Sequence, residues 1–292
     1  GEPGPGEVRI RHKACGLNFI DCYQRSGLYP MTLPHALGME AAGTIEAVGE
    51  GVVHLAPGDR AAYSSAPPGA YCEARVMPAA QVCKLPDAIS FEEGAAISCG
   101  TGTAWNGLNK MGISGQDTVA VFGQGPVGLS GTLSAKAMGA RVVAVDVVPE
   151  RLTLARELGA DHTINSRETD PVAAIRELTK GAGASASLET SGNSSARQQV
   201  LECLAPFARC CYVGVGGPAE IDFNRDVIFK VVTIYGSWTF SKSELIKIAR
   251  FFVETGAPLN KLITHRYSLD QAEEAFSEFD GATTGKCVFV MD

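Results

Sequence analysis

A strand-length apolar run that leads directly into a glycine-rich turn constrains this chain more than any other feature. Residues 119–128 read VAVFGQGPVG, with the spacing GxGxxG after four apolar residues. In such a turn Gly123 permits the tight bend, Gly125 lets the backbone approach a pyrophosphate, and Gly128 lets the next helix pack closely on the strand. The N-terminus of that helix adds unpaired N–H groups and a favourable dipole for an anion. The residues predicted to bind a dinucleotide here are Gly123, Gly125, Pro126, Val127 and Gly128.

An acidic residue at the end of the next predicted strand supports this interpretation. Asp146 closes the apolar run 141–146 and stands 18 residues after Gly128. At that place a carboxylate accepts hydrogen bonds from the adenosine ribose and repels a 2′-phosphate, which favours NAD(H) over NADP(H). Arg151 is also assigned to the cofactor, and because it could cover a phosphate, NADP(H) stays an alternative. The other interpretation of Asp146 is a turn aspartate that caps the helix starting near Pro149.

Further small-residue segments fit the nicotinamide end of such a site. Each follows an apolar strand or opens a helix, so its backbone could lie against a flat ring. An ordinary turn between strand and helix explains each of them about equally well. The residues assigned to the cofactor on this basis are Thr103, Gly214, Gly236 and Ser237.

The pattern of apolar and polar residues changes near residue 98. Before it, short alternating segments separated by Gly and Pro predict a small, mainly antiparallel β domain with one short helix near residues 18–26. After it, apolar runs alternate with amphipathic stretches, which is typical of βαβ units and a parallel sheet. The predicted strands are 118–122, 141–146, 163–165, 186–189, 210–215, 233–235 and 286–291. The predicted helices are 126–138, 149–158, 171–179, 195–204, 241–254 and 270–279.

Composition excludes several classes of protein. The 292 residues carry 25 Lys and Arg against 32 Asp and Glu, and the absence of any block of five like charges predicts no binding to nucleic acid or an anionic membrane. No apolar run reaches the roughly 18 residues of a transmembrane helix. Nine scattered cysteines without a CxxC pair indicate reduced, mostly buried thiols in a cytoplasmic protein. The polar start without an initiator Met does not resemble a signal peptide, and we expect it to lie inside a longer protein.

Beyond the glycine-rich turn, several motifs resemble the medium-chain dehydrogenase/reductase superfamily over essentially the whole chain. Residues 16–30 (GLNFIDCYQRSGLYP), 37–43 (LGMEAAG) and 68–73 (PGAYCE) are similar to its zinc-free quinone oxidoreductase branch. Residues 99–103 (CGTGT), the glycine-rich turn and residues 262–266 (LITHR) look more like its zinc-type alcohol and polyol dehydrogenase branch. Natural recombination and deliberate construction both explain such a mixture.

This resemblance implies an α/β architecture of two parts. Residues 1–98 and 256–292 would form a GroES-like, β-rich catalytic domain, and residues 99–255 a Rossmann domain with a doubly wound parallel sheet. The active site would lie in the cleft at the carboxyl ends of the parallel strands. Because members commonly pair the edge strands of their nucleotide-binding sheets, we expect a homo-oligomer, a dimer or a tetramer, formed near residues 228–235.

The metal ligands of the zinc-dependent members can be compared with this chain position by position. Those members have Cys where this chain has Asn18 and His where it has Met39, and only the third ligand matches, at Cys99. An amide and a thioether do not replace a thiolate and an imidazole at tetrahedral Zn²⁺, so the resemblance implies no zinc and no other metal. The alternative is a new metal site that involves Cys15, Cys22 and Cys99.

The absence of a Lewis acid changes which reductions are plausible. Hydride addition to a simple ketone builds an alkoxide that benefits from a metal, whereas addition to an enone or quinone gives an enolate that hydrogen-bond donors can stabilise. The sequence therefore predicts a zinc-independent, nicotinamide-dependent oxidoreductase that passes hydride to a small-molecule quinone or activated C=C. Asn18 is expected to donate to the carbonyl, and Asp21 to hold the loop or the ribose. The resemblance also assigns pocket shape and a proton source to Tyr23, Tyr29 and Tyr63, each of which could equally be a half-buried ring with a locally satisfied hydroxyl.

Two other functions stay open. One is an NAD-dependent alcohol or polyol dehydrogenase, and the other is a dinucleotide-binding protein with little turnover. The histidines do not decide between them, because His12, His54, His162 and His265 stand at strand edges or in loops and are expected to be solvated.

Overall fold

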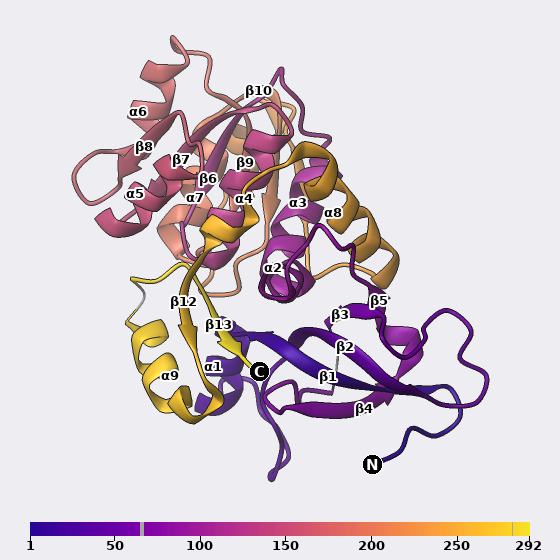
Figure 1. The fold of residues 1–292 in the computed structure, drawn as a ribbon. Coiled ribbons are helices and arrows are strands. Elements are labelled where there is room, and N and C mark those ends of the chain that lie inside the picture. The colour runs from indigo at the N-terminus through magenta and orange to yellow at the C-terminus, as the bar shows by residue number, and fades with distance from the viewer. Residues whose placement is uncertain (65–66, 282) are drawn as a thin grey trace. The chain divides into compact units, whose positions relative to one another are not determined.

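The computed structural model of this chain describes residues 1–64, 67–281 and 283–292 (Figure 1). The chain forms two compact units: unit 1 comprises residues 1–102 and 240–292, and unit 2 comprises residues 103–239. The return to unit 1 therefore comes earlier than the expected residue 256. Helix α8 (Lys242–Thr255) belongs to unit 1, where it packs on strand β5 and the Cys83 thiol donates to the carbonyl oxygen of Lys242 over 3.5 Å.

The sheet of unit 1 is built around strand β1, whose residues alternate between the core and solvent. Val8 and Ile10 are buried, while Arg9 and Arg11 point outward and both pair with Glu46 on the neighbouring strand. The strand order is β12-β13-β1-β2-β3-β5, with β4 also paired to β1, and β13 lies antiparallel to the end of β1 (Figure 1). The bounds are β1 (Glu7–Gly16), β2 (Glu40–Val48), β3 (Arg60–Ser64), β4 (Ala74–Pro78), β5 (Cys83–Lys84), β12 (Ile263–Tyr267) and β13 (Lys286–Val290).

The helices of unit 1 begin where local capping groups predict them. The short helix expected near residues 18–26 is present, and α2 starts after Ser90, whose hydroxyl accepts from the backbone N–H of Glu93 over 3.2 Å. The longer helices, in addition to α8, are α1 (Phe19–Ser26), α2 (Phe91–Ala96) and α9 (Ala272–Asp280). The short ones are η1 (Ala79–Gln81), η2 (Ile97–Thr101, a π-helical turn), η4 (Leu259–Leu262) and η5 (Leu269–Gln271).

Unit 2 confirms the doubly wound parallel sheet. Its strand order is β11-β10-β9-β6-β7-β8, every pair is parallel, and helices pack on the strands they connect (Figure 1). The strands are β6 (Thr118–Phe122), β7 (Arg141–Asp146), β8 (His162–Asn165), β9 (Ala184–Glu189), β10 (Leu204–Tyr212) and β11 (Thr233–Gly236). The helices are α3 (Gly102–Met111), α4 (Pro126–Ala137), α5 (Pro149–Glu157), α6 (Pro171–Leu178), α7 (Ser194–Glu202) and η3 (Phe223–Ile228).

One strand of unit 2 is displaced along the sequence from its prediction. The apolar run suggested residues 210–215, but β10 starts at Leu204, directly after α7, and ends at Tyr212. An irregularity between Leu204 and Arg209 breaks its register with β9, and Phe207 has a φ of +61° there. Pro206 and Arg209 interrupt the apolar pattern, so sequence reasoning missed the first half of the strand.

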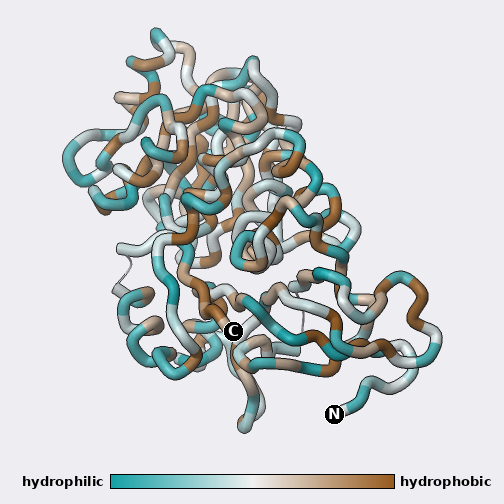
Figure 2. The backbone as a smooth tube through the Cα atoms, in the orientation of Figure 1, coloured by the Kyte–Doolittle hydropathy of each residue, from teal (hydrophilic) through white to brown (hydrophobic). Residues whose placement is uncertain are grey.

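Hydrophobic stretches lie inside unit 2 and hydrophilic ones follow its outer loops (Figure 2). The side chains of β6 and β7 from Val119 to Phe122 and from Val142 to Val145 are almost fully buried, as expected for parallel strands that are covered on both faces. Within the described ranges, none of the helices has the length and apolarity needed to cross a bilayer. All nine cysteines are free thiols.

His12 is not solvated as the sequence suggested but belongs to the interior of unit 1. Its Nδ1 donates to the carbonyl oxygen of Cys72 over 2.7 Å, and its Nε2 accepts from the hydroxyl of Tyr63 over 2.9 Å. Burial, with a smaller effect of Arg75, lowers the pKa of His12 from 6.5 to about 4. A neutral imidazole with one donor and one acceptor therefore completes this part of the core.

We predict that acid destabilises the protein through His12. The unfolded imidazole takes up a proton near pH 6.5 and the folded one only near pH 4, so stability is complete above pH 6.5 and falls as the pH drops toward 4. The loss is about 3 kcal/mol in the free energy of unfolding. Urea titrations of wild type and His12→Gln at pH 7.5 and 5 should give a flatter pH dependence for the variant. His54→Gln, at an exposed histidine, is the matched control; equal slopes for wild type and His12→Gln would refute the prediction.

Candidate functional site

The glycine-rich turn of unit 2 has the backbone geometry that its sequence predicted. Gly123 follows β6 with a φ of +87°, in the left-handed region that favours glycine, and its N–H donates to the carbonyl oxygen of Val145 over 2.8 Å. A Cβ on Gly128 would lie 1.7 Å from the carbonyl oxygen of Gly123, so only glycine fits there. A Cβ on Gly125 meets no atom closer than the Arg151 guanidinium at 3.9 Å, which leaves room for a methyl group at the first turn of α4. Pro126 and Val127 form that first turn.

Asp146 ties the end of β7 to this turn. Its Oδ1 accepts from the backbone N–H groups of Val147 and Val148 over 2.7 and 2.9 Å, and its Oδ2 accepts from the backbone N–H of Gln124. Val148 is the N-cap residue of α5. The carboxylate therefore organises the entry to that helix, as the plainer interpretation held, and also stands beside the glycine-rich turn, as the cofactor interpretation requires.

Arg151 places an unpaired cation beside the open space at Gly125. Its guanidinium carbon lies 3.9 Å from the position that a Cβ on Gly125 would take, and the residue is only 9% exposed. Among the described residues, its Nε and Nη2 have no hydrogen-bond partner. Burial lowers the pKa of Arg151, and the charge of Asp146 opposes this effect. Buried donors without acceptors, next to the N-terminus of a 12-residue helix, fit an anionic group such as the phosphates of a dinucleotide.

A buried carboxylate holds the loop after β9, and an arginine beside it holds the loop after β10. Glu189 accepts from the backbone N–H groups of Ser191 and Gly192 over 2.7 and 2.9 Å. Arg197 lies near the same carboxylate, with 3.9 Å between Nε and Oε2, and its Nη2 donates to the carbonyl oxygen of Gly214 over 2.6 Å. Gly214 is thus fixed in position at the carboxyl end of the sheet.

The segment after β11 is fixed from helix α3. The N–H of Ser237 donates to the carbonyl oxygen of Tyr212 over 3.0 Å, and Lys110 donates to the hydroxyl of Ser237 over 3.2 Å and to the carbonyl of Gly236 over 3.4 Å. Thr103 lies in the first turn of α3. Gly214 and Ser237 therefore follow neighbouring strands at the edge of the sheet where ligands of doubly wound folds bind.

Unit 1 contains a buried ionic group that sequence reasoning missed. The Lys286 ammonium is 2.5 Å from Oε1 of Glu40, and it donates to Oδ1 of Asn18 over 2.9 Å and to the carbonyl of Leu17 over 3.0 Å. Lys286 is 4% exposed and Glu40 is fully buried. The available signals were a lysine at the start of an apolar strand and an acid directly before the apolar run 41–42, neither of which identified the other.

Asp21 extends this network to a second loop. Its Oδ2 accepts from the N–H of Asn18 over 2.9 Å and from the hydroxyl of Tyr71 over 2.7 Å, and its Oδ1 accepts from the N–H of Gly38 over 3.1 Å. Burial raises the pKa of this carboxyl, although Tyr71 and the other donors oppose the rise. Asp21 thus holds the loop in front of β2, one of the two roles expected for it.

Two of the three tyrosines assigned to the pocket contact each other, and the third lies in the core of unit 1. The rings of Tyr23 and Tyr29 contact edge to face with centroids 5.5 Å apart, and both residues are partly exposed. Tyr63 is fully buried in the core of unit 1, and its hydroxyl donates to His12. Burial also raises the pKa of Tyr63, which makes it a poor acid. The structure therefore gives Tyr63 a role in the core, because its hydroxyl has an internal partner.

The donor atoms at the positions of the zinc ligands do not suit zinc. At two positions where the resemblance implies zinc ligands, the amide oxygen of Asn18 accepts from an ammonium group and Met39 offers only a thioether. In the part of the chain that the structure describes, no three His, Cys, Asp or Glu side chains gather as a metal site would require. Cys15, Cys22 and Cys99, the alternative set, therefore form no such group among the described residues.

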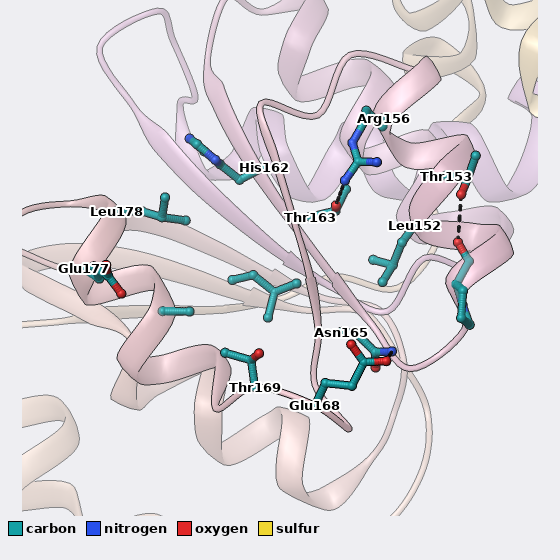
Figure 3. Close-up of a pocket in the computed structure, with 13 residues that line it drawn as sticks. Leu152, Thr153, Arg156, His162, Thr163, Asn165, Glu168, Thr169, Glu177 and Leu178 are labelled. Atoms are coloured by element: carbon teal, nitrogen blue, oxygen red, sulfur yellow. Dashed lines mark hydrogen bonds between the residues drawn. The ribbon is translucent and has the colours of Figure 1, made fainter.

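A pocket elsewhere in unit 2 contains none of the predicted site residues. It has a volume of about 580 Å³ and lies beside the edge strand β8, between α5 and α6 (Figure 3). Several of its polar groups are paired with one another: Arg156 donates to Thr163 over 2.5 Å, and Asn165 donates to Glu168 over 2.7 Å.

Comparisons with known proteins agree with both units. Residues 4–87 match the family model of the alcohol dehydrogenase GroES-like domain, and residues 126–254 match that of zinc-binding dehydrogenases. An uncharacterized zinc-type alcohol dehydrogenase-like protein, YphC of Escherichia coli, is 34% identical over 98% of this chain and 92% of its own length. A quinone oxidoreductase of Pseudomonas aeruginosa is also 34% identical, over 99% of this chain and 92% of its own length.

Solved structures extend the similarity to the whole fold. The crystal structure of an NAD-dependent alcohol dehydrogenase has a TM-score of 0.89 and 31% identity, and it covers all of this chain and 94% of its own. The benzyl alcohol dehydrogenase of Acinetobacter calcoaceticus has a TM-score of 0.91 and 26% identity, with the same coverage.

We predict that replacing Gly128 lowers the stability of the fold, whereas replacing Gly125 lowers the affinity for NADH. Gly128→Ala forces a Cβ into the carbonyl of Gly123 and should destabilise the fold by about 3 kcal/mol. Gly125→Ala has room for its Cβ and should leave the melting temperature unchanged, but it should weaken NADH binding about tenfold because the methyl group occupies the open space beside Arg151. Thermal melts and fluorescence titrations with NADH measure the two effects. NADH affinity equal to wild type in a folded Gly125→Ala protein would contradict the assignment.

Proposed function

We propose that this protein reduces a quinone or an enone without zinc. The chain belongs to the medium-chain dehydrogenase/reductase superfamily and is one of its oxidoreductases. The observation that carries the proposal is the amide of Asn18, whose oxygen accepts from the Lys286 ammonium. The resemblance implies a zinc ligand at this position in the zinc-dependent members. The donor set of unit 1 is thus suited to hydrogen bonding and not to a metal.

Unit 2 supplies the groups that would hold the cofactor. The first turn of α4 at Gly125 and the unpaired guanidinium of Arg151 suit the phosphates, and Asp146 suits the adenosine ribose. Because a carboxylate at this place repels a 2′-phosphate, we propose NAD(H) over NADP(H). The residues that follow β10 and β11, Gly214, Gly236 and Ser237, would face the nicotinamide, together with Thr103. The bound nicotinamide supplies the hydride.

Unit 1 supplies the group for the substrate oxygen. With its oxygen turned to Lys286, the Asn18 amide offers N–H donors, which stabilise the oxygen of an enolate as its charge develops. The paired rings of Tyr23 and Tyr29 would shape the space for a flat substrate. A saturated ketone has no conjugated path for the charge and would need the Lewis acid that this donor set does not bind.

Alcohol or polyol oxidation with NAD is the second candidate. Its support is the names of several relatives and solved neighbours, which are alcohol dehydrogenases. A dinucleotide-binding protein with little turnover is the third candidate, and the same substrate panel separates all three.

We predict that the purified protein oxidises NADH in the presence of benzoquinones or cyclic enones. It should oxidise NADH faster than it oxidises NADPH. Since the reaction needs no metal, EDTA should leave the rate unchanged, and elemental analysis should find less than about 0.1 zinc per chain. Chelator-insensitive oxidation of secondary alcohols without enone reduction would favour the second candidate. One tightly bound zinc per chain would overturn zinc independence.

We further propose that copies of the chain associate through the edge strand β11. Ile234 on this strand is 39% exposed, and Phe229 and Val231 nearby are 78% and 57% exposed. An apolar edge strand with an unpaired side invites pairing with a second strand, and a second copy offers the same edge.

We predict that light scattering after size exclusion gives the mass of a dimer or a tetramer. Ile234→Lys should shift the mass toward that of the 30.6 kDa chain, because a buried lysine at the pairing strand opposes association. Ile246→Lys, at a position on α8 with 48% exposure, is the matched control and should keep the wild-type mass. A monomeric wild type would contradict the proposal.

A further inference from the structure

The side-chain amide of Asn18 is held in one of its two possible orientations by Lys286. The Lys286 ammonium donates to the oxygen of Asn18 and to the carbonyl of Leu17 over 2.9 and 3.0 Å, and it forms an ion pair with Oε1 of Glu40 at 2.5 Å. Since an ammonium cannot accept a hydrogen bond, a flipped amide would place two donors against each other. The amide oxygen is therefore bound inward and the NH₂ group is directed elsewhere.

The NH₂ group of Asn18 is only partly used within unit 1. Its Nδ2 lies 3.5 Å from the carbonyl oxygen of Gly16, a long and weak hydrogen bond. Among the described residues, the structure shows no hydrogen bond from this NH₂ group to the carboxylate of Glu40. With only this long bond, the NH₂ group is able to donate to an oxygen that arrives from outside.

The backbone around the amide is equally constrained. The N–H of Asn18 donates to Asp21 over 2.9 Å, and helix α1 starts at the next residue. A Cβ on Gly16 would lie 1.7 Å from Oε1 of Glu40, so the carboxylate packs directly on the end of β1. These contacts therefore hold both the main chain and the side chain of Asn18 in fixed positions, as a preorganised donor requires.

We infer that Lys286 is a positioning residue for Asn18: together with Glu40 it turns the amide into an oriented hydrogen-bond donor that selects a carbonyl-type oxygen. This inference rests on the proposed function, in which Asn18 contacts the substrate oxygen. Lys286 itself does not touch substrate, because its donors are occupied by the protein. Lys286 affects the reaction only through the orientation of Asn18, and this effect is distinct from any contribution of Lys286 to the stability of the fold.

A mutant cycle tests this dependence. Glu40→Leu with Lys286→Met replaces the ion pair by apolar side chains of similar size, which avoids an unpaired buried charge. We expect Asn18→Ala to lower kcat for enone or quinone reduction about 100-fold, and the Glu40→Leu/Lys286→Met protein to lower kcat about tenfold with little change in KM. The triple variant should be no slower than Asn18→Ala alone, because the pair acts through the amide. If the two losses multiply, the inference is overturned.

Two further variants guard against a merely structural effect. Lys286→Arg keeps a cation at the same place and should restore kcat to within about threefold of wild type. Arg9→Met with Glu46→Leu removes a more exposed ion pair of the same unit and should leave kcat unchanged. If Lys286→Arg is folded by circular dichroism but as slow as the Glu40→Leu/Lys286→Met protein, the inference fails.

A readout without turnover separates this inference from the proposed function. In protein labelled with ¹⁵N-asparagine, the NH₂ signals of Asn18 are assigned by their loss in Asn18→Ala. We expect the Glu40→Leu/Lys286→Met protein to shift these signals and to speed the exchange of the NH₂ protons with water. Shifted signals in a protein that reduces no enone or quinone would refute the proposed function and retain the orienting role. Unmoved signals would refute the orienting role whatever the activity.

Discussion

An ammonium group inside a protein must be surrounded by acceptors, and this requirement at Lys286 organises unit 1. Strand β13 brings the lysine to the end of β1, β2 brings Glu40, and the start of α1 brings Asn18. Asp21 then connects the start of α1 to the loop at Gly38. A divalent metal bound at Asn18 would face this ammonium 2.9 Å from its ligand atom, so the network that positions the amide also opposes a metal.

The parts of the molecule that were predictable from sequence are those with local signals. The GxGxxG turn, the apolar strands around it and the prolines at the starts of α4 and α5 depend on neighbours within a few residues, and unit 2 folds as they predicted. The resemblance to a known family is confirmed by both family models and by relatives that span the chain. The roles of Asn18, Tyr23 and Tyr29 toward a substrate stay predictions.

The parts that were not predictable depend on partners far apart in sequence. Lys286 and Asn18 are 268 residues apart, and nothing near either of them indicates the other. His12 resembled a strand-edge histidine because its partner Tyr63 lies 51 residues later in the sequence, on another strand. The amphipathic pattern of α8 was correct, but periodicity states only that one face is buried and not which unit it packs against.

The pairing of β1 with β13 also has a consequence for synthesis in the cell. Gly16 pairs with Val288, so the central sheet of unit 1 is completed only after residues 286–290 have left the ribosome. Unit 2 is continuous in sequence and has all its strands available earlier. Until β13 has been synthesised, residues 14–16 lack this partner strand on one side. Another unfolded polypeptide can form backbone hydrogen bonds with them there.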